Sequence, residues 1–383
     1  MLSTAPVAEA GSPLPPRPAA EDPPALGRLP FLDRFLPVWI LLAMGVGLGL
    51  GRGVPALARG LDGAQVTRGV PAPIFVGLLA MMYPVLARVS YRRMGTVLGD
   101  RRLLVTSLVL NWLVGPAVMF GLAWALLPDQ PAYRTGLIVV GLARCIAMVL
   151  VWNELSGGDR EAAAVLVALN SAFQILAYAG LGWFYLVALP GWLGLPAGGL
   201  HVSVALVARS VAIFLGIPLA GGLLTRAVGE RARGTAWYET RLLPRLAPFA
   251  LYGLLFTVVV LFALQGRAIT GHPLDVVRIA APLLCYFGIM WGGAFGLGRA
   301  LGLTYPRTTT LAFTAAGNNF ELAIAVAIGV FGATSGEALA GVVGPLVEVP
   351  ALVGLVYVAR WARGRLFALP SDGAAAAARG APT

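Results

Sequence analysis

Ten long apolar stretches with very few charges follow one another along this chain, and they restrict its fold more than any motif does. A helix that crosses a bilayer needs about 20 largely apolar residues, because the hydrocarbon interior offers no partner to an open backbone hydrogen-bonding group. Each stretch reaches or nearly reaches that length. We therefore predict an all-α, polytopic membrane protein with transmembrane helices at about residues 32–50, 72–88, 103–127, 135–155, 161–189, 202–225, 242–264, 276–301, 307–332 and 337–360.

The charged residues support this prediction and exclude several functions. They make up 12% of the chain, against roughly 25% in soluble domains, and the mean hydropathy is +0.82. The net charge of +11 comes from arginine alone, but these arginines stand in short connections rather than on one polar face, which argues against nucleic-acid binding. Without lysine the chain has no Walker A loop, so ATP bound to it does not supply energy.

The cysteines and histidines indicate no metal site and no enzyme. Cys145, Cys285, His201 and His272 have neither the spacing of a zinc site nor that of a disulfide framework. No histidine accompanies Cys145 within the apolar stretches, so a nucleophile–base pair is not expected there. We expect no cofactor, no bound metal and no enzymatic activity, and we interpret Cys285 as a packing residue.

The positions of the arginines predict the orientation of the chain, because positive residues concentrate in the cytoplasmic loops of membrane proteins. With a cytoplasmic N-terminus, the inside segments carry 20 of the 28 arginines. Both termini are then cytoplasmic, and the expected location is the cell membrane.

One membrane domain and two tails are expected. Residues 1–30 are rich in proline and alanine and hold too few apolar side chains to order themselves, so we predict a disordered cytoplasmic tail. Residues 367–383 are rich in alanine, and we predict a second disordered tail. The transporter domain covers residues 31–366, with the first five helices at about 32–189 and the last five at about 202–360.

Ten helices divide into two sets of five, and an odd number in each set makes the second set enter the membrane upside down relative to the first. Such inverted repeats are common in secondary transporters. A trace of one lies in two residue spacings: Cys145 stands sixteen residues before Glu161, and Glu321 stands sixteen residues before Glu337. This spacing would make Cys145 and Glu321 equivalent positions of the two repeats.

Glu321 lies in the middle of an apolar stretch, GNNFELAIAVAIGVFG. A charged side chain at the bilayer centre costs about 2.5–3.5 kcal/mol on insertion scales, and intramembrane carboxyls commonly mark ion or substrate pathways. One interpretation is a group that loads and unloads a coupling proton. The alternative is a permanently protonated group that bonds a neighbouring helix.

Gly317, Asn318 and Asn319 come directly before Glu321 and are poor helix formers. They predict a break in the helix at mid-membrane, which is tolerated only where the backbone is enclosed by protein or faces a cavity. Broken helices of this kind form substrate sites in transporters. The alternative is a polar contact between two intact helices.

Cys145, in GLARCIAMVLVWNEL, is by itself more typical of a small packing residue than of a ligand. Its neighbour Arg144 favours a functional role, because a nearby cation stabilises the thiolate that binds soft metalloids. Arg144 has two further roles open to it, to cap backbone carbonyls or to pair with Glu321. Glu348, between two prolines in GPLVEVPAL, is a second intramembrane carboxyl and a candidate coupling or network residue.

The same stretches resemble a known family. The segments PIFVGLLAMMYPVLARVSY, GLIVVGLARCIAMVLVWNELSGGD, GNNFELAIAVAIGVFG and VVGPLVEVPALVGLVYVA are similar to the arsenite/antimonite efflux carriers of arsenical resistance, within the bile acid/arsenite/riboflavin transporter superfamily. The resemblance runs from residue 31 to about residue 362. Its most specific parts surround Cys145 and Glu321.

The resemblance implies ten helices in an inverted five-plus-five repeat. It implies discontinuous fourth and ninth helices that cross in a core domain, and a panel domain built from helices 1, 2, 6 and 7. It also implies that Cys145 is the essential thiol of the family's ARC motif and that Glu321 is the essential carboxyl of its NNFE motif.

On this basis we expect an arsenite/proton antiporter that confers arsenical resistance, with antimonite as a second candidate substrate. Cys145 would contact arsenic, Asn318 and Asn319 would orient the hydroxyls, and Glu321 would bind substrate and carry the coupling proton. The expected partners are the metalloid, protons and the lipid bilayer.

Arg144 and Glu348 would complete the coupling network. The alternative function is a sodium-coupled symporter of an organic anion of the bile-acid type, in which Asn318, Asn319 and Glu348 would hold sodium. Transport that requires sodium and ignores a pH gradient would favour that alternative.

Overall fold

The computed structural model describes residues 35–54, 56, 60, 63, 65–67, 70–88, 100–195, 203–271 and 273–367. This part of the chain is almost wholly helical, and five helical stretches in it are long and apolar enough to cross a membrane. The prediction of an all-α membrane protein is confirmed, apart from a small antiparallel ribbon of β1 (Gln65–Thr67) and β2 (Val70–Pro71). The predicted tails at 1–30 and 367–383 lie outside the described residues, except for Phe367.

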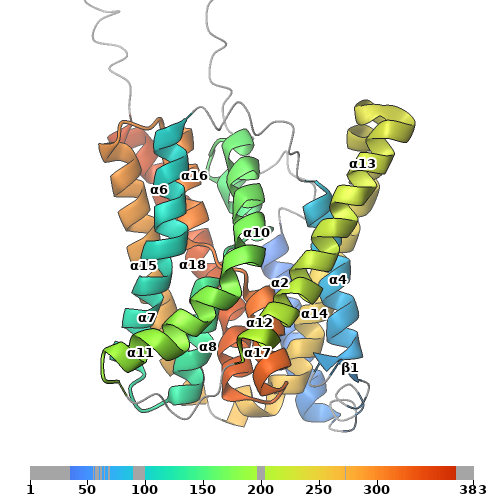
Figure 1. Ribbon diagram of the computed structural model, residues 1–383, viewed down its shortest axis with the longest axis vertical. Coiled ribbons are helices and arrows are strands. Elements are labelled where there is room, and N and C mark those ends of the chain that lie inside the picture. Colours follow the sequence, from blue (N-terminus) through green and yellow to red (C-terminus); the bar gives the residue numbers. More distant parts are fainter. Residues whose placement is uncertain are drawn as a thin grey trace, which may run out of the picture.

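Most helices belong to one group, which we call the bundle (Figure 1). Its members are α6 (Arg101–Val109), η3 (Leu110–Val114), α7 (Gly115–Leu126), α8 (Pro131–Leu142), α9 (Met148–Leu155), α10 (Arg160–Trp183), η4 (Phe184–Ala188), α11 (Leu189–Trp192), α15 (Pro273–Ala300), α16 (Tyr305–Ala316), α17 (Phe320–Phe331) and α18 (Gly336–Leu366). Within it α15 packs on α16 and α18, and α18 packs on α8 and α17. Helices from both halves of the sequence are therefore interleaved.

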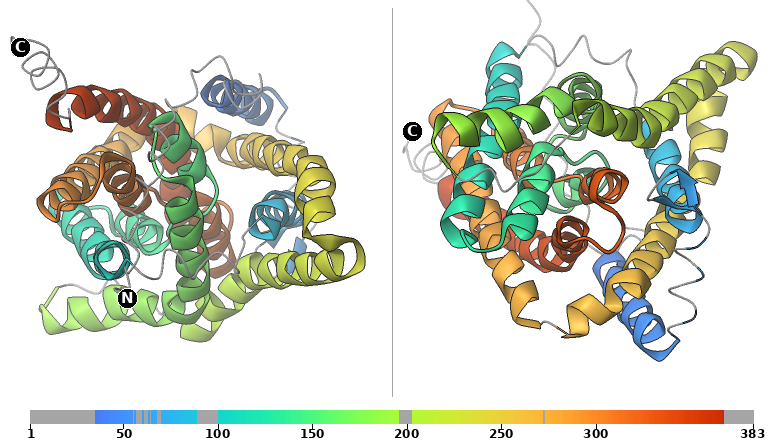
Figure 2. Two further views of the ribbon diagram at one scale, coloured as in Figure 1. Left: turned by 90° about the horizontal axis from the view of Figure 1, so that it is seen from above. Right: turned by 60° about the horizontal axis from the view of Figure 1, so that its bottom comes forward.

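A second group lies beside the bundle, and we call it the side layer (Figure 2). It consists of α2 (Leu36–Gly53), α4 (Ala72–Ala87), α13 (Ile217–Trp237), η6 (Tyr238–Leu242) and α14 (Leu243–Gly271). Within it α14 packs along both α2 and α4, and α13 packs on α4. The segment α12 (Val204–Val211) with η5 (Ala212–Gly216) joins the two groups, because α12 packs on α10 and α17 while η5 packs on α4.

Small residues let the side layer pack closely. A Cβ on Gly47 would lie 2.6 Å from the carbonyl oxygen of Val259, and one on Gly253 would lie 2.7 Å from the backbone nitrogen of Met81. Membrane helices without a hydrophobic driving force associate through such close backbone contacts. Within the glycine-rich run at 45–53, Gly47 and Gly51 therefore form the packing surface against α14.

In the described part of the chain, four π-helical turns interrupt otherwise regular helices, and each of them ends two residues before a proline. These prolines are Pro116, Pro190, Pro218 and Pro244. Proline has no backbone N–H, and its ring clashes with the carbonyl four residues earlier. A π turn widens the helix at that point and so accommodates the proline without breaking the helix.

Two of the predicted transmembrane helices are broken in the middle. The stretch predicted at 135–155 consists of α8 and α9, separated by residues 143–147. The stretch predicted at 307–332 consists of α16 and α17, separated by residues 317–319. The other predicted helices agree with the structure to within a few residues at most ends, and the helix predicted at 202–225 continues to Arg233, before a kink at Gly234.

Candidate functional site

The two breaks, at residues 143–147 and 317–319, meet each other and pair like a short antiparallel ladder. We call this contact the crossing. The backbone N–H of Cys145 donates to the carbonyl oxygen of Gly317 at 3.2 Å, and that of Asn319 donates to the carbonyl oxygen of Ala143 at 3.1 Å. Arg144 and Asn318 stand opposite each other in this bridge. The pairing satisfies backbone groups that no helix serves, which makes an irregular backbone tolerable in the middle of a membrane protein.

Cys145 holds its sulfur at the beginning of α9. The backbone N–H of Val149 donates to Sγ at 3.3 Å, and the side chain is 6% exposed. The first N–H groups of a helix lack partners inside the helix and carry partial positive charge, so they stabilise negative charge on this sulfur. A Cβ at position 317 would lie 3.0 Å from the Cβ of Cys145, so a side chain at this position would press against Cys145.

Arg144 directs its guanidinium toward carbonyls and away from carboxylates. Its Nη1 donates to the Tyr286 hydroxyl at 2.7 Å and to the carbonyl oxygen of Ala315 at 3.4 Å, and its Nη2 donates to the carbonyl oxygen of Gly141. Those two carbonyls belong to the last turns of α16 and α8, where helix carbonyls lack partners within the helix. Arg144 thus caps both broken helices.

This arrangement decides between the roles that the sequence left open for Arg144. Within the described part of the chain no ion pair joins Arg144 to Glu321 or to any other carboxylate. Consecutive residues of an extended segment point in opposite directions, and Val149 supplies the hydrogen bond to the Cys145 sulfur. The expectation that Arg144 stabilises the thiolate directly has no contact in its favour.

Each of the two asparagines uses part of its side chain to hold the break. Asn319 caps α17 by accepting from the N–H of Leu322 at 3.0 Å, and Asn318 donates to the carbonyl oxygen of Val140 at 3.0 Å. The remaining amide atoms, Asn318 Oδ1 and Asn319 Nδ2, are buried and meet no partner among the described residues. One hydrogen-bond acceptor and one donor are thus unused at the break.

The two carboxyls differ in position. Glu348 of α18 is 4% exposed, and its Oε1 accepts from the backbone N–H of Asn318 at 3.4 Å, which places it directly behind the break. Glu321 lies in the first turn of α17 and is partly exposed. Its carboxyl faces a cavity, so only Glu321 of the two is reached from outside the protein.

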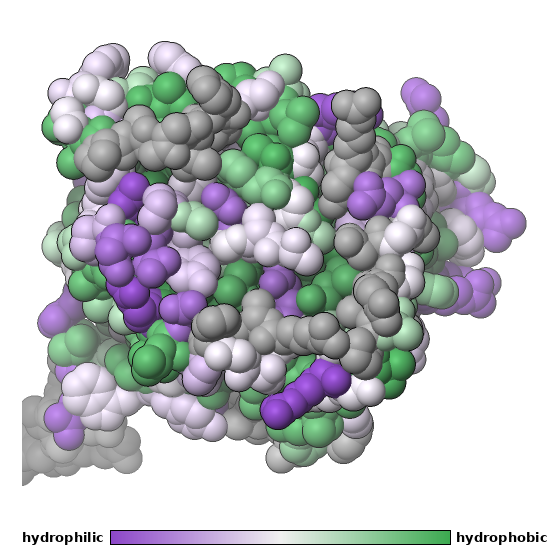
Figure 3. Space-filling view, turned by 90° about the horizontal axis from the view of Figure 1, so that it is seen from below, coloured by the Kyte–Doolittle hydropathy of each residue, from purple (hydrophilic) through white to green (hydrophobic). Residues whose placement is uncertain are grey.

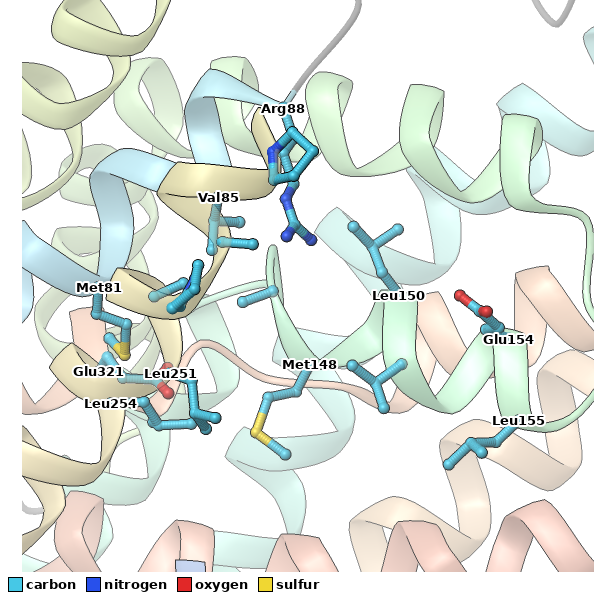
Figure 4. Close-up of a pocket in the computed structure, with 16 residues that line it drawn as sticks. Met81, Val85, Arg88, Met148, Leu150, Glu154, Leu155, Leu251, Leu254 and Glu321 are labelled. Atoms are coloured by element: carbon cyan, nitrogen blue, oxygen red, sulfur yellow. The ribbon is translucent and has the colours of Figure 1, made fainter. Parts of the chain in front are cut away.

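The cavity of about 440 Å³ lies between the side layer and the bundle (Figure 4). Its lining includes Met81, Val85 and Arg88 from α4 and the turn after it, Met148, Leu150, Glu154 and Leu155 from α9, Leu251 and Leu254 from α14, and Glu321 from α17. Because α9 lines it along its whole length, the cavity extends over about 10 Å. It leads from the end of the molecule at Arg88 and Glu154 to the crossing of the broken helices.

On the other side of the crossing the two groups of helices are in direct contact. Gln265 of α14 is buried and donates from Nε2 to the carbonyl oxygen of Ala333 at 2.6 Å, in the loop after α17. Nearby, α12 packs on α17. The side layer and the bundle are therefore apart at the cavity and joined beyond it.

The structure brings several of the candidate residues together and adds a wall that the sequence did not indicate. Cys145, Asn318 and Arg144 meet at the crossing as expected, and Glu321 lies beside it, yet Cys145 and Asn318 are covered from the cavity. The apolar wall from α4 and α14 has no motif that would have revealed it, and Arg88 was interpreted only as an orientation signal.

Two details differ from the expectations. Glu321 is the second residue of α17, whereas Cys145 lies three residues before α9 begins, so the sixteen-residue spacing does not align equivalent positions in the two broken helices. Cys285 is exposed on α15 rather than packed, because that face of α15 has no neighbouring helix in the described structure.

Comparison with known proteins identifies the family. Residues 75–272 match the Sodium Bile acid symporter family. The arsenical-resistance protein Acr3 of Corynebacterium glutamicum is 54% identical over 345 residues, which are 90% of this chain and 92% of that protein. The Acr3 protein of Alkaliphilus metalliredigens is 31% identical over 343 residues, 87% of this chain and 93% of that protein.

A third relative, named an uncharacterized transporter, comes from Synechocystis and is 34% identical over 353 residues, covering 87% of this chain and 90% of that protein. The families matched are transporters, in agreement with the prediction that the chain is not an enzyme. The chain therefore belongs to the arsenical-resistance carriers within the bile acid/arsenite transporter superfamily, and it is a multi-pass membrane protein.

Proposed function

We propose that this protein exports arsenite from the cell by proton-coupled antiport and so confers arsenical resistance. The observation that carries the proposal is the position of Cys145, whose thiol is held at a helix N-terminus within the crossing of two broken helices. The two relatives named as arsenical-resistance proteins support the same substrate. Antimonite, with the same hydroxide chemistry and a soft central atom, is a second candidate substrate.

Arsenite at neutral pH is mainly the uncharged As(OH)₃. The Cys145 thiol can form an As–S bond while its proton leaves with one arsenic hydroxyl as water, and addition of water reverses the step. One thiol supplies only one of the three sulfur ligands that arsenic accepts, so the bond is easily reversed. The free amide atoms of Asn318 and Asn319 are suited to orient the two remaining hydroxyls.

Glu321 is the proposed proton carrier. Its carboxyl lies at the end of the cavity next to the crossing, in the first turn of α17, close to the segment that bears Asn318 and Asn319. In this proposal Glu321 binds a proton at the outer side of the membrane and releases it at the inner side. Arg144 and Glu348 hold the break from behind, and their contacts to backbone groups support this network role.

The proposed transport cycle moves the bundle, as the core domain, against the side layer, as the panel domain. We infer ten helices in an inverted five-plus-five repeat, and the two broken helices are its most visible support. With both termini in the cytoplasm, the cavity at Arg88 and Glu154 opens inward, and the contact from Gln265 to Ala333 closes the outer side.

The experiment measures arsenite uptake into everted membrane vesicles under an imposed pH gradient or an imposed sodium gradient. We expect wild type to accumulate arsenite with the pH gradient alone and the Glu321→Gln variant to lose this response. Glu161→Gln, a matched change at an exposed residue of α10 outside the cavity, should behave as wild type.

Two outcomes would overturn the proposal. If the Glu321→Gln variant still accumulates arsenite with the pH gradient, Glu321 does not carry the coupling proton. Uptake that follows sodium and ignores the pH gradient would favour the sodium-coupled symporter of an organic anion, the activity for which the Sodium Bile acid symporter family is named.

A further inference from the structure

A helical arm extends from the side layer at the edge of the molecule (Figures 1 and 2). It is formed by the last turns of α13, a reversal at Gly234, and the following residues to Arg245. Gly234 has φ of 83°, a conformation that residues with a side chain rarely adopt, and it turns the chain back on itself. The arm is therefore a helical hairpin with its turn at Gly234.

One buried arginine fixes the base of this arm. Arg226 is 8% exposed, and it forms ion pairs with Glu230 at 2.8 Å and with Glu239 at 3.1 Å. Its guanidinium also lies 5.2 Å from the centre of the Tyr238 ring. Both acidic residues of the arm therefore face inward to Arg226, and neither is directed at the outer arginines.

The base is fastened to the end of α4 next to the cavity. The Tyr238 hydroxyl donates to the carbonyl oxygen of Ala87 at 2.9 Å, and Nη1 of Arg226 donates to the carbonyl oxygen of Arg88 at 3.3 Å. Arg88 itself lines the cavity. A ligand that holds the arm in place would thus also hold this edge of the cavity.

The outer surface of the arm carries positive charge without counter-charges. Arg231, Arg233, Arg241 and Arg245 are exposed, and no carboxylate in the described part of the chain pairs with any of them. Trp237 lies under Arg233, with 4.8 Å from the guanidinium carbon to the ring centre. Figure 3 shows hydrophilic residues along the edge of the molecule where α13 projects.

Apolar side chains lie next to these arginines along the same helices. On α13, Leu224 and Val228 are 65% and 56% exposed, and on α14 Phe249 and Tyr252 are each 58% exposed. An exposed apolar band that ends in exposed arginines and an aromatic residue is the pattern of a helix that leaves the bilayer at the headgroup level. On such a helix the positive charges stand at the level of the lipid phosphates.

We propose that the arm binds the anionic headgroups of the surrounding bilayer through Arg231, Arg233, Arg241 and Arg245. Guanidinium groups match phosphate oxygens in geometry and charge, and basic segments next to a transmembrane helix attract anionic lipids. The bound lipids hold the arm, and through Tyr238 and Arg226 they hold the cavity-side end of α4. This role is independent of the identity of the transported solute.

The test uses the purified full-length carrier in nanodiscs of phosphatidylcholine alone and of phosphatidylcholine mixed with phosphatidylglycerol. We expect phosphatidylglycerol to raise the midpoint of thermal unfolding of the wild type by a few degrees, and this shift to shrink at high salt. The double variant Arg231→Gln/Arg241→Gln should lose most of the shift. Its unfolding midpoint in phosphatidylcholine should equal that of wild type, which excludes a folding defect.

The matched control is Arg101→Gln/Arg102→Gln, which removes two exposed arginines from α6 of the bundle. This variant should keep the full shift. The proposal is overturned if the arm variant responds to phosphatidylglycerol as strongly as wild type, or if the control loses as much of the shift. It is also overturned if soluble glycerol phosphate gives the same shift, because the ligand is then a free phosphate and not the bilayer.

Discussion

The guanidinium of Arg144 donates a hydrogen bond to the hydroxyl of Tyr286, with 2.7 Å between Nη1 and Oη. Arg144 is fully buried, and α15 thereby holds the residue that caps α8 and α16. The positive charge stands where the negative ends of two helix dipoles meet, which is the favourable sign for a cation at helix C-termini. The crossing is thus stabilised by a charge that belongs to the protein itself.

Replacing Arg144 with alanine removes this cap. Because each buried acceptor left without a donor costs about 1–3 kcal/mol, we expect Arg144→Ala to lower the free energy of unfolding by about 3 kcal/mol. Tyr286→Phe deletes a single hydroxyl and should cost about 1 kcal/mol. Unfolding by SDS in mixed micelles measures both. Equal losses for the two variants would show that the carbonyls of Gly141 and Ala315 do not depend on Arg144.

The glycine opposite the thiol offers a sharper test of the crossing. A Cβ at position 317 would stand 3.0 Å from the Cβ of Cys145, so Gly317→Ala should displace the thiol and strongly reduce arsenite uptake. Gly121→Ala is the matched control, because a Cβ there meets nothing within 4 Å and alanine favours the helix. Vesicle uptake normalised to carrier content checks both variants. Unchanged uptake by Gly317→Ala would separate the crossing from substrate binding.

The cavity between the side layer and the bundle can be filled without touching the crossing. Leu251 lines the cavity from α14, and a tryptophan at this position should occupy the space in front of Glu321 and abolish uptake. The adjacent Tyr252 is 58% exposed on the outer face, so Tyr252→Trp should transport normally. Uptake by Leu251→Trp at the wild-type rate would mean that the substrate takes another path.

Residue propensities alone predicted one of the two helix breaks, and the break in the fourth helix was expected only from the family resemblance. Gly317, Asn318 and Asn319 are poor helix formers, so the sequence predicted the break between α16 and α17. In the structure Asn319 caps α17. The segment from Ala143 to Ala147 contains no such residues. It is extended because Gly317 and Asn319 pair with its backbone, which is a contact between distant parts of the chain.

The partner of Arg144 was equally hidden from the sequence. From the sequence, Arg144 could either cap backbone carbonyls or pair with Glu321. Which of the two it does depends on which helix ends meet at the crossing. The carbonyl of Ala315 is 171 residues away from Arg144 in the sequence, so only the fold brings it within reach. The wall of the cavity from α4 and α14 was missed for the same reason, since ordinary apolar residues form it.

The most direct test of the central claim compares the two cysteines of the chain. Cys145 lies at the crossing and Cys285 is exposed on α15, so Cys285→Ser is a matched control for Cys145→Ser. The measurement is arsenite accumulation in everted vesicles under a pH gradient, normalised to carrier content. We predict accumulation by wild type and Cys285→Ser and none by Cys145→Ser. Accumulation by Cys145→Ser at the wild-type rate, or none by wild type, would contradict arsenite efflux through this thiol.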